Sequence, residues 1–284
     1  MNMIKIIECP RDAMQGIADF IPTDLKIRYI NQLLKAGYDT IDFGSFVSPK
    51  AVPQMADTKE VIQGLDLNEN SSKLLAIVAN LRGAVDAAEF PEITCLGYPF
   101  SISETFQQRN TRKSITESVE LVKQIQEICV SKGKELVVYI SMAFGNPYND
   151  PWGTDIAEKW VETLAREGIN TFALADTVGS ADSESIKYLF GELIPRFPAI
   201  TFGAHFHAHP NKRKEKILAA WETGCRRFDT AMMGFGGCPF AEDHLVGNIS
   251  TESLLEFCVE NNIASNLNLK AFNQAQDIAA QIFG

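Results

Sequence analysis

Eight short apolar runs, each followed by a longer stretch of helical periodicity, constrain the fold of this 284-residue chain more than any other feature. Short runs rich in Ile, Val and Phe are typical of buried strands, and apolar residues spaced three and four apart are typical of the helices that cover them. The pattern predicts strands at 3–9, 39–44, 74–78, 92–97, 135–141, 170–175, 200–206 and 226–231. It predicts helices at 23–36, 57–64, 81–88, 114–131, 154–167, 182–194, 211–223, 251–261 and 269–282.

Capping residues stand where several of these helices should begin and end. Ser114 precedes Glu117 by three positions, as in a capping box, and Gly37 and Gly133 follow two of the helices. Eight strand–helix units without a Pro/Ser-rich linker indicate a closed parallel barrel, which takes about 250 residues as one unit. We therefore expect an α/β protein with a TIM (β/α)8 barrel and an additional C-terminal helix, with residues 1–284 forming one domain. The helix at 57–64 is short, so the number of units could differ by one.

The charge balance argues against a nucleic-acid partner. The formal net charge is −10 and the pI is near 5.0, which repels a phosphate backbone unless Lys and Arg are clustered. One dense basic run exists, formed by Lys212, Arg213, Lys214 and Lys216. Because Glu215 interrupts it at a helix start, we interpret the run as a solvated helix face.

Cysteine usage and the N-terminus indicate a cytoplasmic protein with no membrane association. The six cysteines show no CxxC and no paired spacing, which favours reduced thiols over a disulfide framework. The N-terminus begins directly with the apolar residues of the first predicted strand, without the pattern of a signal peptide. No apolar run approaches the length that spans a membrane.

Charged side chains follow the first predicted strand, where an ordinary strand would end in turn residues. They are Glu8, Arg11, Asp12 and Gln15. In a barrel of this type, catalytic groups lie just after the strands, at the C-terminal mouth. A structural Arg–Asp pair that closes the barrel is the alternative interpretation.

Two histidines at the seventh strand predict a metal site. His205 and His207 are two residues apart, so both imidazoles lie on one face of an extended segment. Two imidazoles and one carboxylate, for which Asp12 is the best candidate, suit a divalent ion that keeps open positions, such as Mg²⁺ or Mn²⁺. A pair of hydrogen-bonded core histidines is the alternative. His209, beside Pro210, is expected in a loop outside the set of ligands.

A glycine-rich segment at 234–240 follows the eighth strand. Glycines there are typical of a flexible loop, and such a loop can move over a barrel mouth. Cys238 stands between Gly237 and Pro239, which is difficult to explain by packing. We interpret Cys238 as a functional thiol.

Five stretches of the sequence match the pattern of one known family: Cys9-Pro10-Arg11-Asp12, the segment at 45–55, Ser103-Glu104-Thr105-Phe106, His205-Phe206-His207 and Gly236-Gly237-Cys238-Pro239. Together they resemble the 3-hydroxy-3-methylglutaryl-CoA lyase family. The resemblance extends in order from about residue 4 to residue 260. The segment at 45–55 and the loop Gly236-Gly237-Cys238-Pro239 are specific to this lyase, whereas Arg11-Asp12 and the two histidines are shared by a wider superfamily of metallolyases and Claisen synthases.

The resemblance implies cleavage of 3-hydroxy-3-methylglutaryl-CoA into acetyl-CoA and acetoacetate. It implies a divalent ion held by Asp12, His205, His207 and Asn248, which would act as a Lewis acid and a template. It also implies that Arg11 polarises the thioester carbonyl where enolate charge develops.

Further roles are implied by the same resemblance. Cys238 and His205 are the candidates for proton transfer, and the sequence does not distinguish the acid from the base. Gln15, Lys50 and Asn80 are expected to contact the acyl-CoA substrate. Glu8 and Glu252 match positions that support the site, and a homodimer is common among such barrels.

Three departures from the family lie near the barrel mouth. Where the family carries a glutamate after the second strand, this chain has Asp42. Asp42 is a catalytic candidate by this match, but its side chain is one methylene shorter, so a proton relay through it loses reach. Where the family has an acidic residue after the two histidines, it has Ala208, which can change how the ligands are oriented. Met142 and Asn146 occupy positions where relatives often have cysteines.

Three rival functions remain open. A Claisen-type synthase that condenses acetyl-CoA with a 2-oxo acid is the nearest, but such enzymes usually append a long C-terminal region and lack the Gly-Gly-Cys-Pro loop. An aldolase acting on a hydroxy-oxo acid would leave Cys238 without a task. A barrel that binds CoA esters without turnover is the third, since Asp42 and Ala208 depart from the family.

Overall fold

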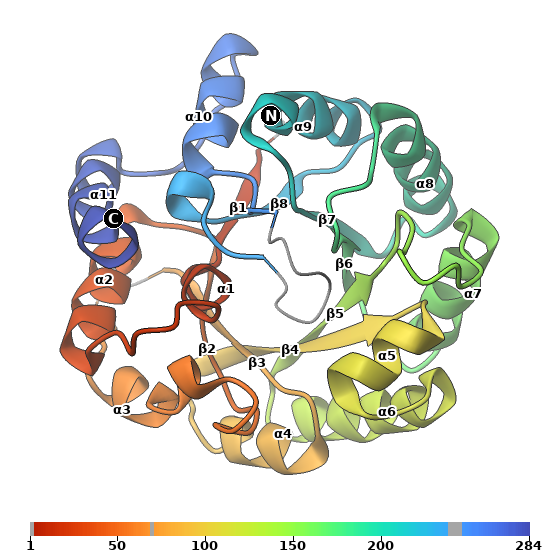
Figure 1. The fold of residues 1–284 in the computed structure, drawn as a ribbon, viewed down its shortest axis with the longest axis horizontal. Coiled ribbons are helices and arrows are strands. Elements are labelled where there is room, and N and C mark those ends of the chain that lie inside the picture. Colours follow the sequence, from red (N-terminus) through yellow and green to blue (C-terminus); the bar gives the residue numbers. More distant parts are fainter. Residues whose placement is uncertain (1–2, 69–70, 238–245) are drawn as a thin grey trace.

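Eight parallel strands close into a barrel in the computed structural model, which describes residues 3–68, 71–237 and 246–284. Strands pair in sequence order, and the pairing of β1 with β8 closes the ring (Figure 1). The strands are β1 (Lys5–Glu8), β2 (Thr40–Ser45), β3 (Lys73–Ile77), β4 (Ile93–Ser101), β5 (Glu135–Ser141), β6 (Thr171–Asp176), β7 (Thr201–Phe206) and β8 (Arg227–Thr230). The predicted barrel and its eight units are confirmed.

Helices surround the barrel on all sides (Figure 1). They are α1 (Pro10–Met14), α2 (Thr23–Ala36), α3 (Thr58–Gln63), α4 (Leu81–Ala88), α5 (Glu104–Thr111), α6 (Ile115–Ser131), α7 (Thr154–Ala165), α8 (Ser183–Arg196), α9 (Arg213–Glu222), α10 (Thr251–Glu260) and α11 (Leu269–Phe283). The additional C-terminal helix α11 packs against α2 on the outside of the barrel. Short 3₁₀ turns lie at Pro53–Met55, Pro210–Lys212 and Met232–Gly234.

Alternation along the strands divides the apolar side chains between two cores. In β5, Val137 and Tyr139 belong to a small cluster inside the barrel, whereas Val138 and Ile140 belong to the large core between strands and helices. Successive residues of a strand point to opposite faces, so this division follows from period-two geometry. The interior is therefore packed at its base, and polar side chains occupy its C-terminal end.

Three elements differ from the prediction. Helix α1 is only five residues long, and α5 has the polar sequence ETFQQRNT, so neither shows a long apolar periodicity. Strand β4 extends to Ser101, four residues beyond the predicted end. The Ser103 side chain accepts a hydrogen bond from the amide of Phe106, which is the N-cap signal that could have located α5.

The interpretation of the basic run as a solvated face is wrong for one of its members. Lys212 and Lys214 are exposed and pair with surface glutamates, as predicted. Lys216 instead is only 3% exposed, because it lies on the face of α9 that packs inward against the loop after β6.

The described cysteines and the lengths of the helices can be compared with the sequence predictions. The five cysteines within the described ranges are free and buried, namely Cys9, Cys95, Cys129, Cys225 and Cys258. Among the helices of the described part of the chain, none is long and apolar enough to cross a membrane.

Candidate active site

A cavity of about 470 Å³ opens at the C-terminal end of the barrel. Its volume is in the range typical of sites for small molecules and cofactors. Side chains from the ends of most strands line it, among them Arg11, Asp12, Ser141, His205 and His207. The predicted site residues that follow β1 and β7 are therefore brought together at one mouth.

Asp12, His205 and His207 form a compact group of possible metal ligands. One donor atom of each lies within 4.8 Å of the other two, and all three residues are buried. Nε2 of His207 lies 4.0 Å from Oδ2 of Asp12, and it is buried without a hydrogen-bond partner among the described residues. A buried ring nitrogen with a free lone pair requires an explanation, and a metal ion at this point supplies one. The donor set fits a divalent cation.

The opposite nitrogen of each imidazole is fixed by an acceptor. Nδ1 of His207 lies 2.9 Å from the carbonyl oxygen of Thr177, and Nδ1 of His205 lies 3.1 Å from Oδ2 of Asp229. When Nδ1 donates to these acceptors, Nε2 keeps its lone pair toward the cavity. Burial lowers the pKa of His207, so this ring is neutral at pH 7 as a ligand must be. Burial would also lower the pKa of His205, but Asp229 outweighs it and raises that pKa.

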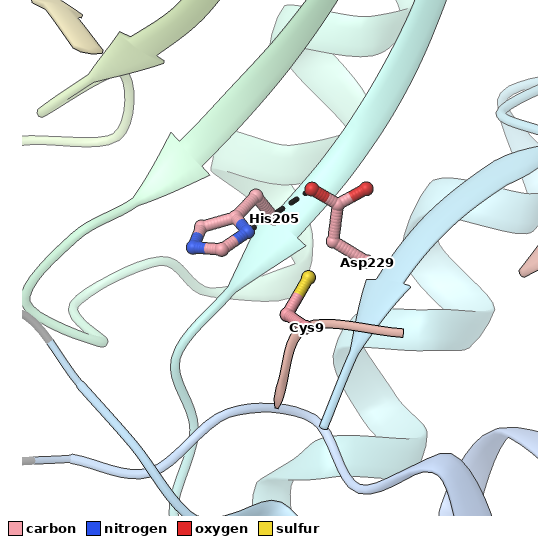
Figure 2. A group of neighbouring side chains, drawn as sticks. All are labelled: Cys9, His205 and Asp229. Atoms are coloured by element: carbon pink, nitrogen blue, oxygen red, sulfur yellow. Dashed lines mark hydrogen bonds and ion pairs between the residues drawn. The ribbon is translucent and has the colours of Figure 1, made fainter. Parts of the chain in front are cut away.

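Cys9, His205 and Asp229 form a second close group, which shares His205 with the first (Figure 2). The dashed line in Figure 2 is the bond between His205 and Asp229. Burial, reinforced by Asp229, raises the pKa of the Cys9 thiol, so the thiol stays protonated and is a poor ligand. The second oxygen of Asp229 already accepts a hydrogen bond from Nη1 of Arg227 at 2.7 Å. We therefore interpret this group as support for His205 rather than as a separate metal site.

Asn248 holds the carboxylate of Asp12. Its Nδ2 donates to Oδ2 of Asp12 at 2.6 Å and to the carbonyl of Phe235 at 2.9 Å. An amide that donates through nitrogen directs its oxygen elsewhere, where it can serve as a further ligand. Burial would raise the pKa of Asp12, but Arg11 and the two histidines outweigh burial and lower it to about 2. The carboxylate is therefore ionised throughout the physiological range.

Arg11 is held by three side chains. Its Nε and Nη2 donate to the Asp42 carboxylate, and its Nη1 donates to Asp12 and Gln15. A guanidinium has five N–H groups, so one N–H on Nη2 has no acceptor within the described part of the chain. Asp42 lies inside β2 and is fully buried, and burial raises its pKa to about 6 against the effect of Arg11. Asp42 thus contacts Arg11 directly and orients it.

Two glutamates hold the chain after β8. Oε1 of Glu8 accepts from the amide of Met232 at 2.6 Å, and the Glu252 carboxylate accepts from the amide of Met233 at 3.0 and 3.1 Å. Met233 has a φ of +61°, a left-handed conformation that is uncommon for a residue with a side chain. These bonds fix the backbone where the glycine-rich segment begins.

The remaining predicted residues lie at the rim or outside the described ranges. Lys50 is exposed at the cavity, and Asn80 lines it while its side chain accepts from the amide of Gly83 at the start of α4. His209 is exposed and does not belong to the groups of possible ligands found among the described residues. Cys238, the predicted functional thiol, lies outside the described residues.

The sequence prediction missed one wall of the cavity. Residues of α5 and the turn after it line the site, namely Phe106, Asn110, Thr111, Arg112 and Lys113. Arg112 has a φ of +58° and ends α5 in a left-handed conformation. Because α5 is short and polar, the sequence pattern predicts no helix here and gives no indication that these basic residues lie at the barrel mouth.

Two of the departures from the family have a visible structural setting. Ala208 is buried, and its amide donates to the carbonyl of Gly247. Met142 is buried at the end of β5 with a φ of +59°, and its amide donates to Oγ1 of Thr177. At both positions the main-chain amide donates a hydrogen bond to a neighbouring loop, so the side chain takes no part in the contact.

Comparison with known proteins agrees with this geometry. A family model described as HMGL-like matches residues 4–279. The hydroxymethylglutaryl-CoA lyase YngG of Bacillus subtilis is 32% identical over 261 residues, which cover 92% of this chain and 86% of that protein. The cytoplasmic 3-hydroxy-3-methylglutaryl-CoA lyase of Rattus norvegicus is 34% identical over 262 residues, covering 89% and 73%. An HMG-CoA lyase from Acinetobacter baumannii, solved with coenzyme A and 3-methylmalate, has a TM-score of 0.91 at 32% identity and covers 99% of this chain and 91% of its own.

Proposed function

This chain belongs to the HMGL-like family, and from that premise we propose that it is a divalent-metal-dependent carbon–carbon lyase. Its substrate is 3-hydroxy-3-methylglutaryl-CoA, and the products are acetyl-CoA and acetoacetate. The lyases of Bacillus subtilis and Rattus norvegicus carry this activity in their names. The bound coenzyme A in the Acinetobacter baumannii structure supports an acyl-CoA ester as the ligand class.

One observation carries the proposal. His207 lies close to Asp12 and His205 in the cavity that Arg11 also lines, and its Nε2 has no hydrogen-bond partner among the described residues. A divalent ion held by Asp12, His205, His207 and the amide oxygen of Asn248 would supply Lewis acidity toward the hydroxyl and carboxylate oxygens of the substrate. We propose Mg²⁺ or Mn²⁺ because oxygen and imidazole ligands with open positions suit these ions.

The reaction needs one proton removed and one proton delivered. When the tertiary hydroxyl loses its proton, the electron pair of the O–H bond forms the C=O bond of acetoacetate as the C2–C3 bond breaks. The pair of electrons from that bond moves to C2 and gives the enolate of acetyl-CoA. A proton delivered to C2 completes acetyl-CoA. We assign one of these transfers to Cys238. His205, the other predicted candidate, has Nδ1 held by Asp229 and Nε2 directed at the metal, so it has no ring nitrogen left to take a proton while it is a ligand.

Arg11 is placed to stabilise the enolate. Its second Nη2–H, which has no acceptor among the described residues, would donate to the thioester oxygen, where negative charge accumulates as the bond breaks. Asp42 holds the other edge of the guanidinium through Nε and Nη2, so the donor is oriented before substrate binds. We propose that Asp42 acts through Arg11. A direct proton relay through Asp42 would require a longer side chain that reaches the substrate.

The rim would bind the remainder of the acyl-CoA. Lys50, Arg112 and Lys113 place cationic side chains around the cavity, and Asn80 adds an amide. Phosphate groups of a CoA ester are the matching anions. Gln15, which holds Arg11 and Asp12, completes the inner wall. We also retain a homodimer and a cytoplasmic location as parts of the proposal.

The test is release of acetoacetate from 3-hydroxy-3-methylglutaryl-CoA by the metal-depleted protein, with and without added Mg²⁺ or Mn²⁺. Wild type should release acetoacetate only with metal, and Cys238→Ala should lose most of the rate. Cys95→Ala is the matched control, since Cys95 lies at the base of the barrel away from the cavity lining.

Absence of turnover by metal-loaded protein would rule out this substrate. Condensation of acetyl-CoA with a 2-oxo acid would then identify a Claisen-type synthase. Cleavage of a hydroxy-oxo acid without a CoA ester would identify an aldolase. Binding of the CoA ester without turnover of any of these compounds would identify a binding protein.

A further inference from the structure

Lys216 is a buried cation directly behind one of the candidate metal ligands. Its Nζ donates to Oδ2 of Asp176 at 2.5 Å, to the carbonyl of Gly179 at 3.0 Å and to the carbonyl of His207 at 3.0 Å. An ammonium group has three N–H donors, so all three are satisfied. The two charged residues are 3% and 1% exposed.

The contacts of Lys216 join two loops at the barrel mouth. Asp176 ends β6, Gly179 lies in the loop that follows, and His207 follows β7. The amide of His207 also donates to the carbonyl of Asp176 at 3.3 Å. Both oxygens of Asp176 accept from the amide of Ala181, which closes the β6 loop on itself.

This loop carries the atom that orients His207. The carbonyl of Thr177, between Asp176 and Gly179, is the acceptor for Nδ1 of His207. The position of this carbonyl decides which way Nε2 of His207 points, the ring nitrogen for which the described part of the chain offers no hydrogen-bond partner. Lys216 thus contacts His207 directly through its main chain, and indirectly through the loop that contacts its ring.

We propose that Lys216 is a positioning residue that holds His207 and the β6 loop in the geometry for metal binding. The inference rests on the proposed metal-dependent function and adds a residue that touches neither substrate nor metal. The Lys216–Asp176 pair supplies the charged contact behind the main chain of His207. Residues that orient metal ligands typically change metal affinity about 10- to 100-fold when they are removed.

The test measures Mn²⁺ binding to metal-depleted protein by electron paramagnetic resonance, which needs no substrate. Lys216→Met keeps the length of the side chain and removes its donors, so the Kd for Mn²⁺ should rise about 10- to 100-fold. Lys214→Met is the matched control on the same helix, where Lys214 is exposed and pairs with Glu256 and Glu260. The control should bind Mn²⁺ as wild type does.

A second variant covers the possibility that Lys216→Met does not fold, because it leaves the buried carboxylate of Asp176 uncompensated. Lys216→Met combined with Asp176→Asn removes both charges and still lacks the donors to the carbonyls of Gly179 and His207. It should fold, as judged by circular dichroism, and keep a weakened affinity. A wild-type Kd in either folded variant would overturn the inference.

The proposed function and this inference fail in different ways. If wild type binds no Mn²⁺, the metal site is wrong and the inference falls with it. If wild type and Lys216→Met bind Mn²⁺ equally, only the positioning role is wrong. If wild type binds Mn²⁺ and releases no acetoacetate, the substrate is wrong while the comparison of the two Kd values still decides the role of Lys216.

Discussion

Arg227 donates a hydrogen bond from Nη1 to Oδ1 of Asp229 inside the barrel, at 2.7 Å. Gly203 leaves the space for this guanidinium, since a Cβ there would lie 2.6 Å from Nη1. The other oxygen of Asp229 faces Nδ1 of His205. The buried Arg227 therefore balances the charge of the carboxylate that orients His205. Lys216 is the buried cation next to the other candidate ligand, His207.

Arg227→Met should destabilise the protein strongly. Removal of one partner of a buried ion pair leaves a charge without compensation, which typically costs about 3–5 kcal/mol. The free energy of unfolding in urea measures the loss. Arg226→Met is the matched control, because Arg226 is partly exposed and lies over the ring of Trp221, so a change of about 1 kcal/mol or less is expected there. Equal losses in the two variants would contradict a structural role for the Arg227–Asp229 pair.

Metal should stabilise the folded protein, and the effect should depend on His207. A ligand that binds only the folded state at 100 times its Kd adds about 2.7 kcal/mol to the free energy of unfolding. Mn²⁺ should therefore raise the Tm of wild type and leave that of His207→Ala unchanged. His209→Ala, whose ring is exposed outside the group of ligands, should respond as wild type does. A metal-dependent rise of Tm in His207→Ala would show that His207 is not a ligand of the metal.

Glu8 should make stability depend on pH. Burial raises its pKa to about 8, although hydrogen bonds from Thr251 and Met232 lower it in part. Thr251 Oγ1 lies 2.6 Å from Glu8 and 2.9 Å from Oγ1 of Thr230, and one hydroxyl proton cannot serve both. Protonation of Glu8 would resolve this conflict, because Glu8 could then donate to Thr251 while Thr251 donates to Thr230.

The sign of the effect follows from the raised pKa. The folded state binds the Glu8 proton more tightly than the unfolded chain, whose value is 4.5. This contribution to stability is complete below pH 4.5 and is lost as pH rises toward about 8. Glu8→Gln, which has no proton to lose, should flatten the dependence of urea unfolding between these limits. An unchanged pH profile in Glu8→Gln would show that Glu8 is ionised in the folded protein.

Lys113 should affect substrate binding without affecting chemistry. It lines the rim of the cavity from the turn after α5, whereas Asp12 and the two histidines lie at the ends of β1 and β7. A contact that is equal in the ground state and the transition state changes KM alone. Lys113→Gln should raise the KM for the CoA ester about threefold to tenfold at low salt and leave kcat unchanged, and added salt should reduce the difference. Lys132→Gln, a surface residue paired with Glu89, is the control, and a fall in kcat with unchanged KM in Lys113→Gln would refute the assignment.

Much of the site was predictable from short stretches of sequence. His205 and His207 share a face because a strand has a period of two, and Arg11 and Asp12 follow β1 at the mouth that all eight strands share. The rim formed by Arg112 and Lys113 was missed because α5 is polar and short. The interpretation of Lys216 failed because a run of lysines carries no information about which face of α9 is buried.

The sequence by itself determined the barrel, its eight units and the identity of the candidate ligands, because these depend on local periodicity and on the chemistry of single residues. Only the tertiary structure decided which residues contact and orient those ligands. Asp229 and Arg227 support His205 from the interior of the barrel, and Lys216 joins β6 to His207 from the helical layer. Such buried pairs depend on which side chains meet across neighbouring strands and helices, and a linear pattern of charges does not specify these long-range contacts.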